Sequence, residues 1–399
     1  MTPRTGERPL KEHRATLGIT FLIVFIDLVG FGIVIPILPL YGERFNPSGL
    51  TLGLLMASYS AMQFVFAPIL GRISDRVGRR PVLLISLVGS VIGYLLFGFA
   101  GSMAVLFASR IIDGISGGNI ATVQAVIADI TGPDDRAKGM GIIGAAFGLG
   151  FILGPAVGAL LVGIAPWLPG VAAALTSAVA FTLVLFKLPE TLPEDARREA
   201  RRHPLNLTSL REVLSDHPLI AFCYATILLV IFAFSNFETT FAQFATARHG
   251  LGMSQIGWLF VYAGVLGAVI QRGLVGRLVK IFGAQRLVVA GSLIAAVAVG
   301  AVPYPSSVTG LMVVLAGLAV GQGLVSPSLS SLTSKLVHPD EVGGVMGIYQ
   351  AFSSLARIGG PLWAELAFHR GAPWPFRTAA VAYFLAFGVV VMLRRRLRT

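Results

Sequence analysis

The sequence predicts an all-α integral membrane protein whose twelve transmembrane helices form two pseudo-symmetric six-helix bundles. Three observations predict this fold: a highly apolar composition, twelve apolar runs and an internal repeat. Of the 399 residues, 55% are hydrophobic and 13% are charged, and the mean hydropathy is +0.80. Soluble domains carry about 25% charged residues, so the composition argues against an ordinary soluble globule. Because a spanning helix needs about 20 apolar residues, the chain has room for twelve.

Twelve apolar runs follow one another along the chain, and each predicts one helix to within a few residues. In order they lie at about 16–41, 49–70, 81–101, 103–128, 139–163, 169–187, 219–246, 253–275, 286–304, 308–332, 343–366 and 373–393. We place the break between the third and fourth runs at Gly101-Ser102. The first run follows basic residues, as in a signal peptide, but it is too long for one and lacks a small-residue cleavage site. We therefore expect an uncleaved first helix.

One long polar stretch divides the runs into two sets of six. This division predicts an N-terminal six-helix bundle at 1–187, a cytoplasmic linker at 188–217 and a C-terminal six-helix bundle at 218–399. The linker could carry a short amphipathic helix on the membrane surface, but a solvated tether is the interpretation that we favour.

The two halves repeat in sequence at a nearly constant offset. Gly154-Pro155 recurs as Gly360-Pro361, Pro133-Asp134 as Pro339-Asp340, and Gly71-Arg72 as Gly276-Arg277. Six helices per half is an even number, which makes the copies parallel repeats about an axis along the membrane normal. Transporters with a binding site between their halves are built in this way.

The basic residues fall on one side of the predicted topology. Of the 31 lysines and arginines, 25 lie on the side of both termini, and Arg110 and Arg357 lie within helices. The opposite side has four, which are Arg44, Arg248, Arg370 and Arg377. The positive-inside rule therefore predicts a multi-pass protein of the cell (inner, cytoplasmic) membrane with both termini cytoplasmic. This distribution, rather than a nucleic-acid partner, accounts for the net charge of +12.

Residue types needed for several other activities are missing from the sequence. The single cysteine, Cys223, excludes an intramolecular disulfide and a thiolate zinc site. The six histidines fall in loops or at membrane edges, and no G-x-x-x-x-G-K-[ST] phosphate-binding string occurs. These observations disfavour a membrane-embedded enzyme and an ATP-driven pump, and we expect no metal and no cofactor.

A glycine- and arginine-rich loop follows the second predicted helix. It contains Gly71, Asp75, Arg76, Gly78, Arg79 and Arg80. Asp75 beside these arginines can form a charged latch, although a solvated charge run would look the same in an arbitrary loop. With twelve helices and a half repeat, the string resembles the signature loop of the major facilitator superfamily. The resemblance covers nearly the whole chain and implies that fold, and we place Asp129 in the same gating group.

Two further motifs resemble those of proton-coupled members of the family. Arg110, followed by Gly114, resembles an R-x-x-x-G motif of the fourth helix. Gly150, Gly154, Pro155 and Gly158 resemble the antiporter motif G-x-x-x-G-P-x-x-G-G, with Ala159 in place of the last glycine. The glycine stripe allows close helix approach and the proline bends the helix. Generic close packing is the alternative explanation.

The first predicted helix resembles that of drug/proton antiporters. It carries Asp27, followed by Gly30, Gly32, Pro36 and Pro39. Tetracycline exporters are the nearest relatives that the resemblance suggests, and it does not extend to tetracycline itself as the substrate.

Ionisable residues within apolar runs are costly in a membrane and are therefore functional candidates. We expect Asp27 and Asp113 to form the proton-coupling site, modulated by Arg110, and Glu238 to be a second candidate. Burial disfavours a charged carboxylate whereas a nearby arginine favours it, so a balanced carboxylate can load and release protons. The alternatives are that Arg110 only pairs with Asp113, and that Glu238 only faces water at the outer mouth.

Polar and aromatic residues within the runs predict an uncharged substrate cavity. The candidates are Gln63, Asn119, Gln124, Asn236, Phe237, Gln271, Gln322, Gln350 and Arg357, and Arg357 could instead pair with Glu238. Such a cavity suits amphiphilic, aromatic or cationic compounds. We predict a proton-coupled multidrug efflux antiporter, acting as a monomer on a small-molecule substrate in the lipid bilayer, and conferring antibiotic resistance. The alternative is a symporter or uniporter for a sugar or another small metabolite.

Overall fold

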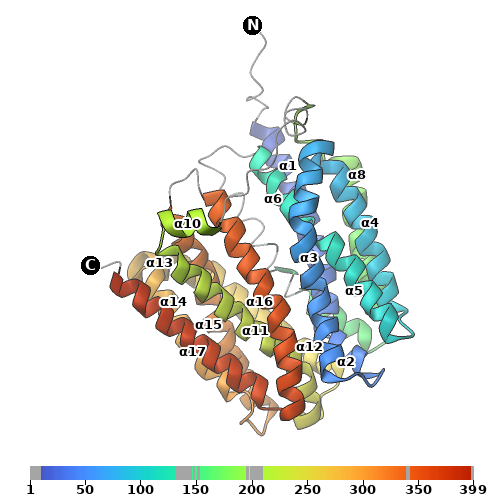
Figure 1. Cartoon of the computed structure of the whole chain (residues 1–399). Coiled ribbons are helices and arrows are strands. Elements are labelled where there is room, and N and C mark those ends of the chain that lie inside the picture. Colours follow the sequence, from blue (N-terminus) through green and yellow to red (C-terminus); the bar gives the residue numbers. More distant parts are fainter. Residues whose placement is uncertain are drawn as a thin grey trace. The chain divides into compact units, whose positions relative to one another are not determined.

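The computed structural model describes residues 10–130, 146, 149–150, 153–194, 197, 210–337 and 342–396. Apart from short connections, these residues are helical (Figure 1). The helices of the first half are α1 (Leu10–Val34), α2 (Leu38–Glu43), α3 (Gly49–Val77), α4 (Arg79–Gly98), α5 (Met103–Gly117), α6 (Ile120–Ile130) and α8 (Leu168–Lys187). Those that follow are α10 (Leu210–Asp216), α11 (Ile220–His249), α12 (Met253–Val269), the π-helix η1 (Ile270–Val275), α13 (Gly276–Phe282), α14 (Ala284–Ala301), α15 (Val308–Lys335), α16 (Val342–Arg370) and α17 (Trp374–Arg396).

The described helices cover at least part of each of the twelve predicted runs. Nine stretches in the described part of the chain are long and apolar enough to cross a membrane, and Leu153–Val162 and α12 are shorter apolar helices. The 29-residue helix α16, which carries Arg357 and Glu365, covers the run predicted at 343–366. Large apolar side chains such as Ile85 (73% exposed) and Phe186 (74% exposed) face outward, as the solvent of a lipid bilayer permits. The predicted all-helical membrane fold is confirmed.

Three of the predicted runs are interrupted helices rather than single ones. The first run breaks at residues 35–37, where Pro36 has no amide hydrogen to donate, and Pro39 then lies in the first turn of α2. The fourth run breaks between Gly117 and Ile120, which separates α5 from α6. The eighth continues from α12 into the π-helix η1, a geometry often found at functional positions.

The chain forms two compact units. Unit 1 comprises Met1–Ile35 and Met62–Leu205, and unit 2 comprises Pro36–Ala61 and Asn206–Thr399. The division passes through α3, so that α2 and the first turns of α3 belong with the second unit. The predicted domain boundary at the linker stays a prediction.

Each unit has its own apolar core between its helices. In unit 1, α4 lies beside α5 and α8, and Leu83, Leu87 and Val184 are buried between them (Figure 1). In unit 2, α11 lies beside α16 and α17, and α14 lies beside α15 and α17. Phe237, Phe241 and Phe260 form an aromatic group in this second core, with ring centroids 4.9 to 6.3 Å apart. Such ring pairs favour the packing of their helices beyond simple burial.

The sequence repeat has a counterpart in the packing. A Cβ placed on Gly154 would lie 2.6 Å from Cα of Gly32, and one on Gly360 would lie 2.6 Å from Cβ of Ser235. The first contact joins the antiporter-motif helix to α1, and the second joins α16 to α11 in the equivalent place of unit 2. Both units therefore use a glycine of the repeated Gly-Pro pair for close helix approach. The repeated segments around Pro133 and Pro339 lie outside the described residues.

The described parts of the linker are folded against the bundles. Helix α10 lies at the C-terminal end of the predicted linker, and its Val213 is 5% exposed and belongs to the core of unit 2. Residues 188–192 contact the start of α4, as described below. The solvated tether that the composition favours is therefore wrong for these two stretches, because each offers side chains that a bundle can bury or bind.

Candidate functional site

The break between α5 and α6 lies beside Asp27 in unit 1. Gly118 lets this break approach α3 closely, since a Cβ there would lie 2.9 Å from the amide nitrogen of Ala67. Gln63 of α3 donates from Nε2 to the carbonyl oxygen of Gly117 at 2.9 Å, which satisfies a group released at the end of α5. Asn119, 6% exposed, follows the break, and its side chain hydrogen-bonds Asp27 of α1.

Asp113 and Arg110 form a buried ion pair one turn before the break. Nη1 of Arg110 lies 3.1 Å from Oδ2 of Asp113, and both side chains are 2% exposed. The guanidinium also donates to Ser109 Oγ and lies 5.5 Å from the ring centroid of Phe97. Ser90 and Tyr94 of α4 hydrogen-bond the Asp113 carboxylate. This close approach of α4 requires Gly93, where a Cβ would lie 3.0 Å from Cβ of Asp113.

The charges of this cluster do not balance when both carboxylates are ionised. Asp113 acts electrostatically on Asp27, and Oδ1 of Asp27 is buried with no hydrogen-bond partner among the described residues. Two carboxylates and one guanidinium carry one net negative charge, whereas one bound proton makes the cluster neutral. Because an uncompensated buried charge costs several kcal/mol, the arrangement favours holding one proton. The structure brings Asp27, Asp113, Arg110 and Asn119 together as one group.

In unit 2, Glu238 and Arg357 interact electrostatically, and no salt bridge is found between them among the described residues. Glu238 of α11 is 8% exposed, and Arg357 of α16 acts on it electrostatically. Among the residues that the structure describes, no ion pair within 4 Å joins these two side chains. The two side chains thus influence each other electrostatically but do not form the direct ion pair that was predicted as an alternative.

The remaining substrate candidates are scattered in the structure. Asn236 is wholly buried and donates from Nδ2 to the carbonyl of Phe232 in its own helix at 2.8 Å, and Phe237 lies in the aromatic group of α11 and α12. Gln124 of α6 and Gln322 of α15 are half-buried. Gln271 in the π-helix and Gln350 in α16 are exposed. No hydrogen bond joins Gln271, Gln322 or Gln350 to another described side chain, so their role stays a prediction.

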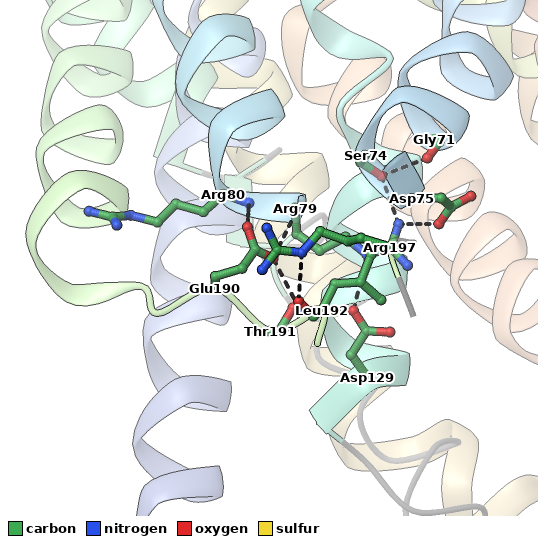
Figure 2. Close-up of polar contacts among 10 residues, drawn as sticks. All are labelled: Gly71, Ser74, Asp75, Arg79, Arg80, Asp129, Glu190, Thr191, Leu192 and Arg197. Carbon is green, nitrogen blue, oxygen red and sulfur yellow. Dashed lines mark hydrogen bonds and ion pairs between the residues drawn. The ribbon is translucent and has the colours of Figure 1, made fainter. Parts of the chain in front are cut away.

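The glycine-rich loop forms a compact latch between α3, α4 and α6, which Figure 2 shows in close-up. Arg79, at the start of α4, donates to Ser74 Oγ at 2.7 Å and to Asp129 Oδ2 at 3.0 Å, and it also pairs with Asp75. Gly78 precedes it with φ of +120°, a conformation that favours glycine. Arg80 donates to the carbonyl of Leu185 at the end of α8. Arg76 is exposed, and the carbonyl of Gly71 accepts from Ser74 Oγ at 2.6 Å.

Sequence reasoning missed Glu190, which closes this latch from the linker. Its carboxylate accepts from the amide of Arg79 at 2.9 Å and from the amide of Arg80 at 3.2 Å (Figure 2). These amides belong to the first turn of α4, where helical partners are lacking and a negative charge is stabilised. Thr191 adds a hydrogen bond to Asp129 Oδ2 at 3.2 Å. The only signal in the sequence was an acid at the end of the sixth run, opposite a basic loop.

The antiporter motif packs against the helix that carries Asp27. A Cβ on Gly150 would lie 2.7 Å from Cβ of Leu28, the neighbour of Asp27, and Gly154 contacts Gly32. Gly158 is buried, and Cδ of Pro155 lies near Gly32. The motif glycines therefore set the position of the Asp27 backbone. A shift of this helix along α1 would move the surroundings of that carboxylate directly.

Comparison with known proteins shows the family. The Major Facilitator Superfamily profile matches residues 20–361. The chain is 34% identical to the class C tetracycline resistance protein of Escherichia coli over 88% of this chain and 89% of that protein. It is 30% identical to the class D tetracycline resistance protein of Salmonella ordonez over 94% of this chain and 96% of that protein. Among solved structures, that of the human organic anion transporter MFSD10 has a TM-score of 0.73 and 29% identity, covering 96% of this chain and 100% of that chain.

These relatives are matched over nearly their whole lengths, and the fold of the MFSD10 structure covers all but a small part of this chain. The function that goes with the fold is the movement of a small molecule across a membrane, not the catalysis of a reaction. The chain is therefore a multi-pass membrane protein that belongs to the major facilitator superfamily of transporters.

Proposed function

We propose that this transporter is a proton-coupled antiporter that exports amphiphilic aromatic or cationic compounds, such as tetracycline-like drugs, by alternating access. The observation that carries the proposal is the charge imbalance of the Asp27 cluster. Asp27 has a neutral partner, Asn119, and the charged residue that acts on it is a second carboxylate, Asp113. Arg110 can compensate one of the two charges, so the other carboxylate is free to exchange a proton.

The proposed cycle uses this proton as the coupling ion. With a proton bound, the cluster has no net charge, so it does not bear the cost of an uncompensated charge in a low-dielectric interior. A cationic or strongly polarised substrate that enters the cavity supplies the missing positive charge and allows the proton to leave. At this cluster, one proton is then released inward for each such substrate that moves outward. Because Asp113 is already paired with Arg110 at 3.1 Å, we assign the exchanging role to Asp27 and a balancing role to Asp113 and Arg110.

The resistance proteins supply the substrate class of the proposal. Two relatives, at 30% and 34% identity, are tetracycline resistance proteins, and a 26% identical relative is the multidrug resistance protein 2 of Bacillus subtilis. We propose that Phe237 and the other candidates of unit 2 contribute to an aromatic, weakly polar binding surface. The basic loops would face the cytoplasm of the cell membrane, as the positive-inside rule predicts.

The test uses purified protein in liposomes with an acidic interior and a pH-sensitive dye inside. Tetracyclines, fluoroquinolones and lipophilic cations are added outside, one at a time, to wild type and to Asp27→Asn. We expect substrate-triggered proton efflux from wild type and its loss in Asp27→Asn. Asp216→Asn makes the same chemical change at an exposed linker position and should keep the wild-type rate. Equal rates for Asp27→Asn and Asp216→Asn would contradict the coupling role.

A specific observation supports a second substrate class. The MFSD10 relative is described as an organic anion transporter, and Arg357 is a half-buried cation that makes no salt bridge in the described part of this chain. An amphiphilic organic anion therefore belongs in the substrate panel. If Arg357→Gln abolished anion movement and left cation movement intact, anions would be the substrates that this arginine recognises. Uptake of a sugar or metabolite without proton exchange would instead favour a symporter or uniporter.

A further inference from the structure

A second carboxyl group is buried in unit 2, where α11 and α16 end. The first turns of α3 lie directly against this part of α16. A Cβ on Gly53 would lie 3.1 Å from Cα of Leu362 and 3.3 Å from Cβ of Glu365, and one on Gly49 would overlap the ring of His369. Helix α2 contacts α11 in the same unit. Helices α3 and α11 thus contact α16 at Glu365, and α2 packs against α11 in the same unit.

Glu365 is completely buried, and only one of its two carboxylate oxygens accepts a hydrogen bond among the described residues. Its exposed fraction is 0%, and Oε1 accepts a hydrogen bond from Nε2 of Gln243 in α11 at 3.0 Å. Oε2 is buried and has no hydrogen-bond partner among the described residues. A buried, charged carboxylate oxygen left without a donor costs more free energy than the same oxygen in a neutral, protonated carboxyl group.

The charged surroundings also favour a proton on this group. Glu43 of α2 is the charged residue that acts on Glu365, and its charge is of the same sign. Gln243 on α11 is neutral, and Gly53 on α3 has no side chain. On the same helix, His369 interacts with Glu43, and its Nδ1 lies 3.1 Å from the backbone carbonyl oxygen of Glu365. Burial raises the pKa of Glu43 above its ordinary value, and His369 opposes that rise.

The side chains around Glu365 suit a bound proton better than a bound metal ion. Divalent cations need several oxygen or nitrogen ligands around one point, and no group of three such side chains is found in the part of the chain that the structure describes. A proton needs one free carboxylate oxygen, which Glu365 Oε2 provides. Gln243 can keep its hydrogen bond to Oε1 when the proton is on Oε2.

We propose that Glu365 is a second proton-binding site of this transporter, separate from the Asp27 cluster and located in unit 2. Proton binding at Glu365 stands on its own geometry, and its part in transport rests on the proposed function. Protonation removes the repulsion between α2 and α16 at Glu43 and Glu365, so it stabilises the contact of residues 36–61 with the end of α16. Loss of the proton would loosen that contact.

The test is infrared difference spectroscopy on the full-length protein in lipid, with ¹³C-labelled glutamate to separate glutamic from aspartic carboxyl bands. We expect a carbonyl band from a protonated glutamic acid near neutral pH in wild type and in Asp27→Asn. Glu365→Gln, which keeps the size of the side chain, should remove that contribution. Gln243→Leu should move it to higher frequency, because the carbonyl loses its hydrogen-bond donor.

The second variant keeps Glu365 in place, so the test does not depend on the folding of Glu365→Gln alone. An unchanged band in Glu365→Gln, or an unshifted one in Gln243→Leu, would overturn the inference. If the band behaves as expected, counting protons per exported drug in liposomes should give a lower number for Glu365→Gln than for wild type. Absence of any drug-driven proton flux in wild type would contradict the proposed function and leave the Glu365 band as the separate result.

Discussion

At the residue scale, the single carboxylate of Glu190 connects the start of α4 to the linker. Its two oxygens accept from the amides of Arg79 and Arg80, which are the first two residues of α4. The same carboxylate also accepts from the amide of Leu192 at 3.1 Å, so it ties the start of the linker to the start of the helix. A neutral side chain of the same length could hold one of these bonds, but a short apolar one could hold none.

Replacing Glu190 should therefore open the first turn of α4 locally. A helix cap is worth about 0.5–2 kcal/mol, and about 1–2 kcal/mol corresponds to a factor of roughly 5–30 in a local opening equilibrium. We expect amide hydrogen exchange at Arg79, Arg80 and Val82, the residues of this turn that carry an amide hydrogen, to increase by this factor in Glu190→Ala. Glu190→Gln, which retains one oxygen acceptor, should show a smaller increase. Wild-type exchange rates in Glu190→Ala would show that the carboxylate does not cap this helix.

The contrast between Asp27 and Glu190 shows which residues a sequence can single out. Asp27, Asp113 and Arg110 could be predicted because an ionisable side chain inside an apolar run has no water to solvate it. Glu190 and Glu365 stand at the ends of apolar runs, where solvent is the default partner. The contacts that give them a role reach residues 111 and 122 positions away, to Arg79 and Gln243, and no local pattern encodes such pairs.

At the scale of elements, close helix packing depends on which side of a helix a glycine occupies. Gly359 and Gly360 are adjacent in α16, but a Cβ on Gly359 meets nothing within 4 Å. One on Gly360 would lie 2.6 Å from Cβ of Ser235 and 3.3 Å from the carbonyl oxygen of Phe232 in α11. The two positions therefore form a matched pair within one helix.

Alanine at these two positions should have opposite effects on stability. Gly360→Ala overpacks the α11–α16 contact and should lower the free energy of unfolding by about 1–3 kcal/mol. Gly359→Ala adds only helix propensity, worth up to about 1 kcal/mol in favour of folding. Thermal unfolding in detergent measures both, and Ser235→Gly should restore the stability lost in Gly360→Ala. Equal shifts for the two single variants would rule out this contact as the reason for the glycine.

The helix breaks were less predictable than the glycine contacts. The pair Gly117-Gly118 occurs within an apolar run, and a spanning helix can tolerate glycine. The separation of α5 from α6 depends on the approach of α3, where Gln63 takes up the freed carbonyl of Gly117. Likewise, the π-helix η1 has no sequence signal beyond a polar interruption at Gln271. Local residue patterns predicted the all-helical order of the chain, and tertiary contacts decide where the helices are interrupted.

At the scale of the whole molecule, the same construction appears in both units. Each unit has a core of packed helices. In each, the helix that carries the Gly-Pro pair packs closely against another helix, which is α1 in unit 1 and α11 in unit 2. A buried acidic residue lies near that contact. Asp27 lies beside the Gly150 and Gly154 contacts in unit 1. In unit 2, Glu238 lies one turn beyond Ser235, which contacts Gly360. The apolar runs and the repeat offset were enough to predict this duplication, because both are periodic features of the chain itself.

The orientation of the molecule in the membrane follows from its charges and can be measured at the two ends of one helix. Helix α14 is preceded by Lys280 and followed by Ser306, and both residues are exposed. The positive-inside rule places Lys280 in the cytoplasm and Ser306 outside. Native Cys223 is 0% exposed, so the unmodified chain should react little with a thiol reagent and serves as the background control.

A membrane-impermeant maleimide applied to intact cells should label Ser306→Cys and leave Lys280→Cys unmodified. Permeabilising the cells should then expose Lys280→Cys to the reagent at a comparable level. Because one substitution changes only one of 25 basic residues on the predicted cytoplasmic side, it should not invert the topology. Labelling of Lys280→Cys in intact cells, with protection of Ser306→Cys, would place the basic loops outside. That result would also reverse the direction of proton movement that the antiport proposal requires.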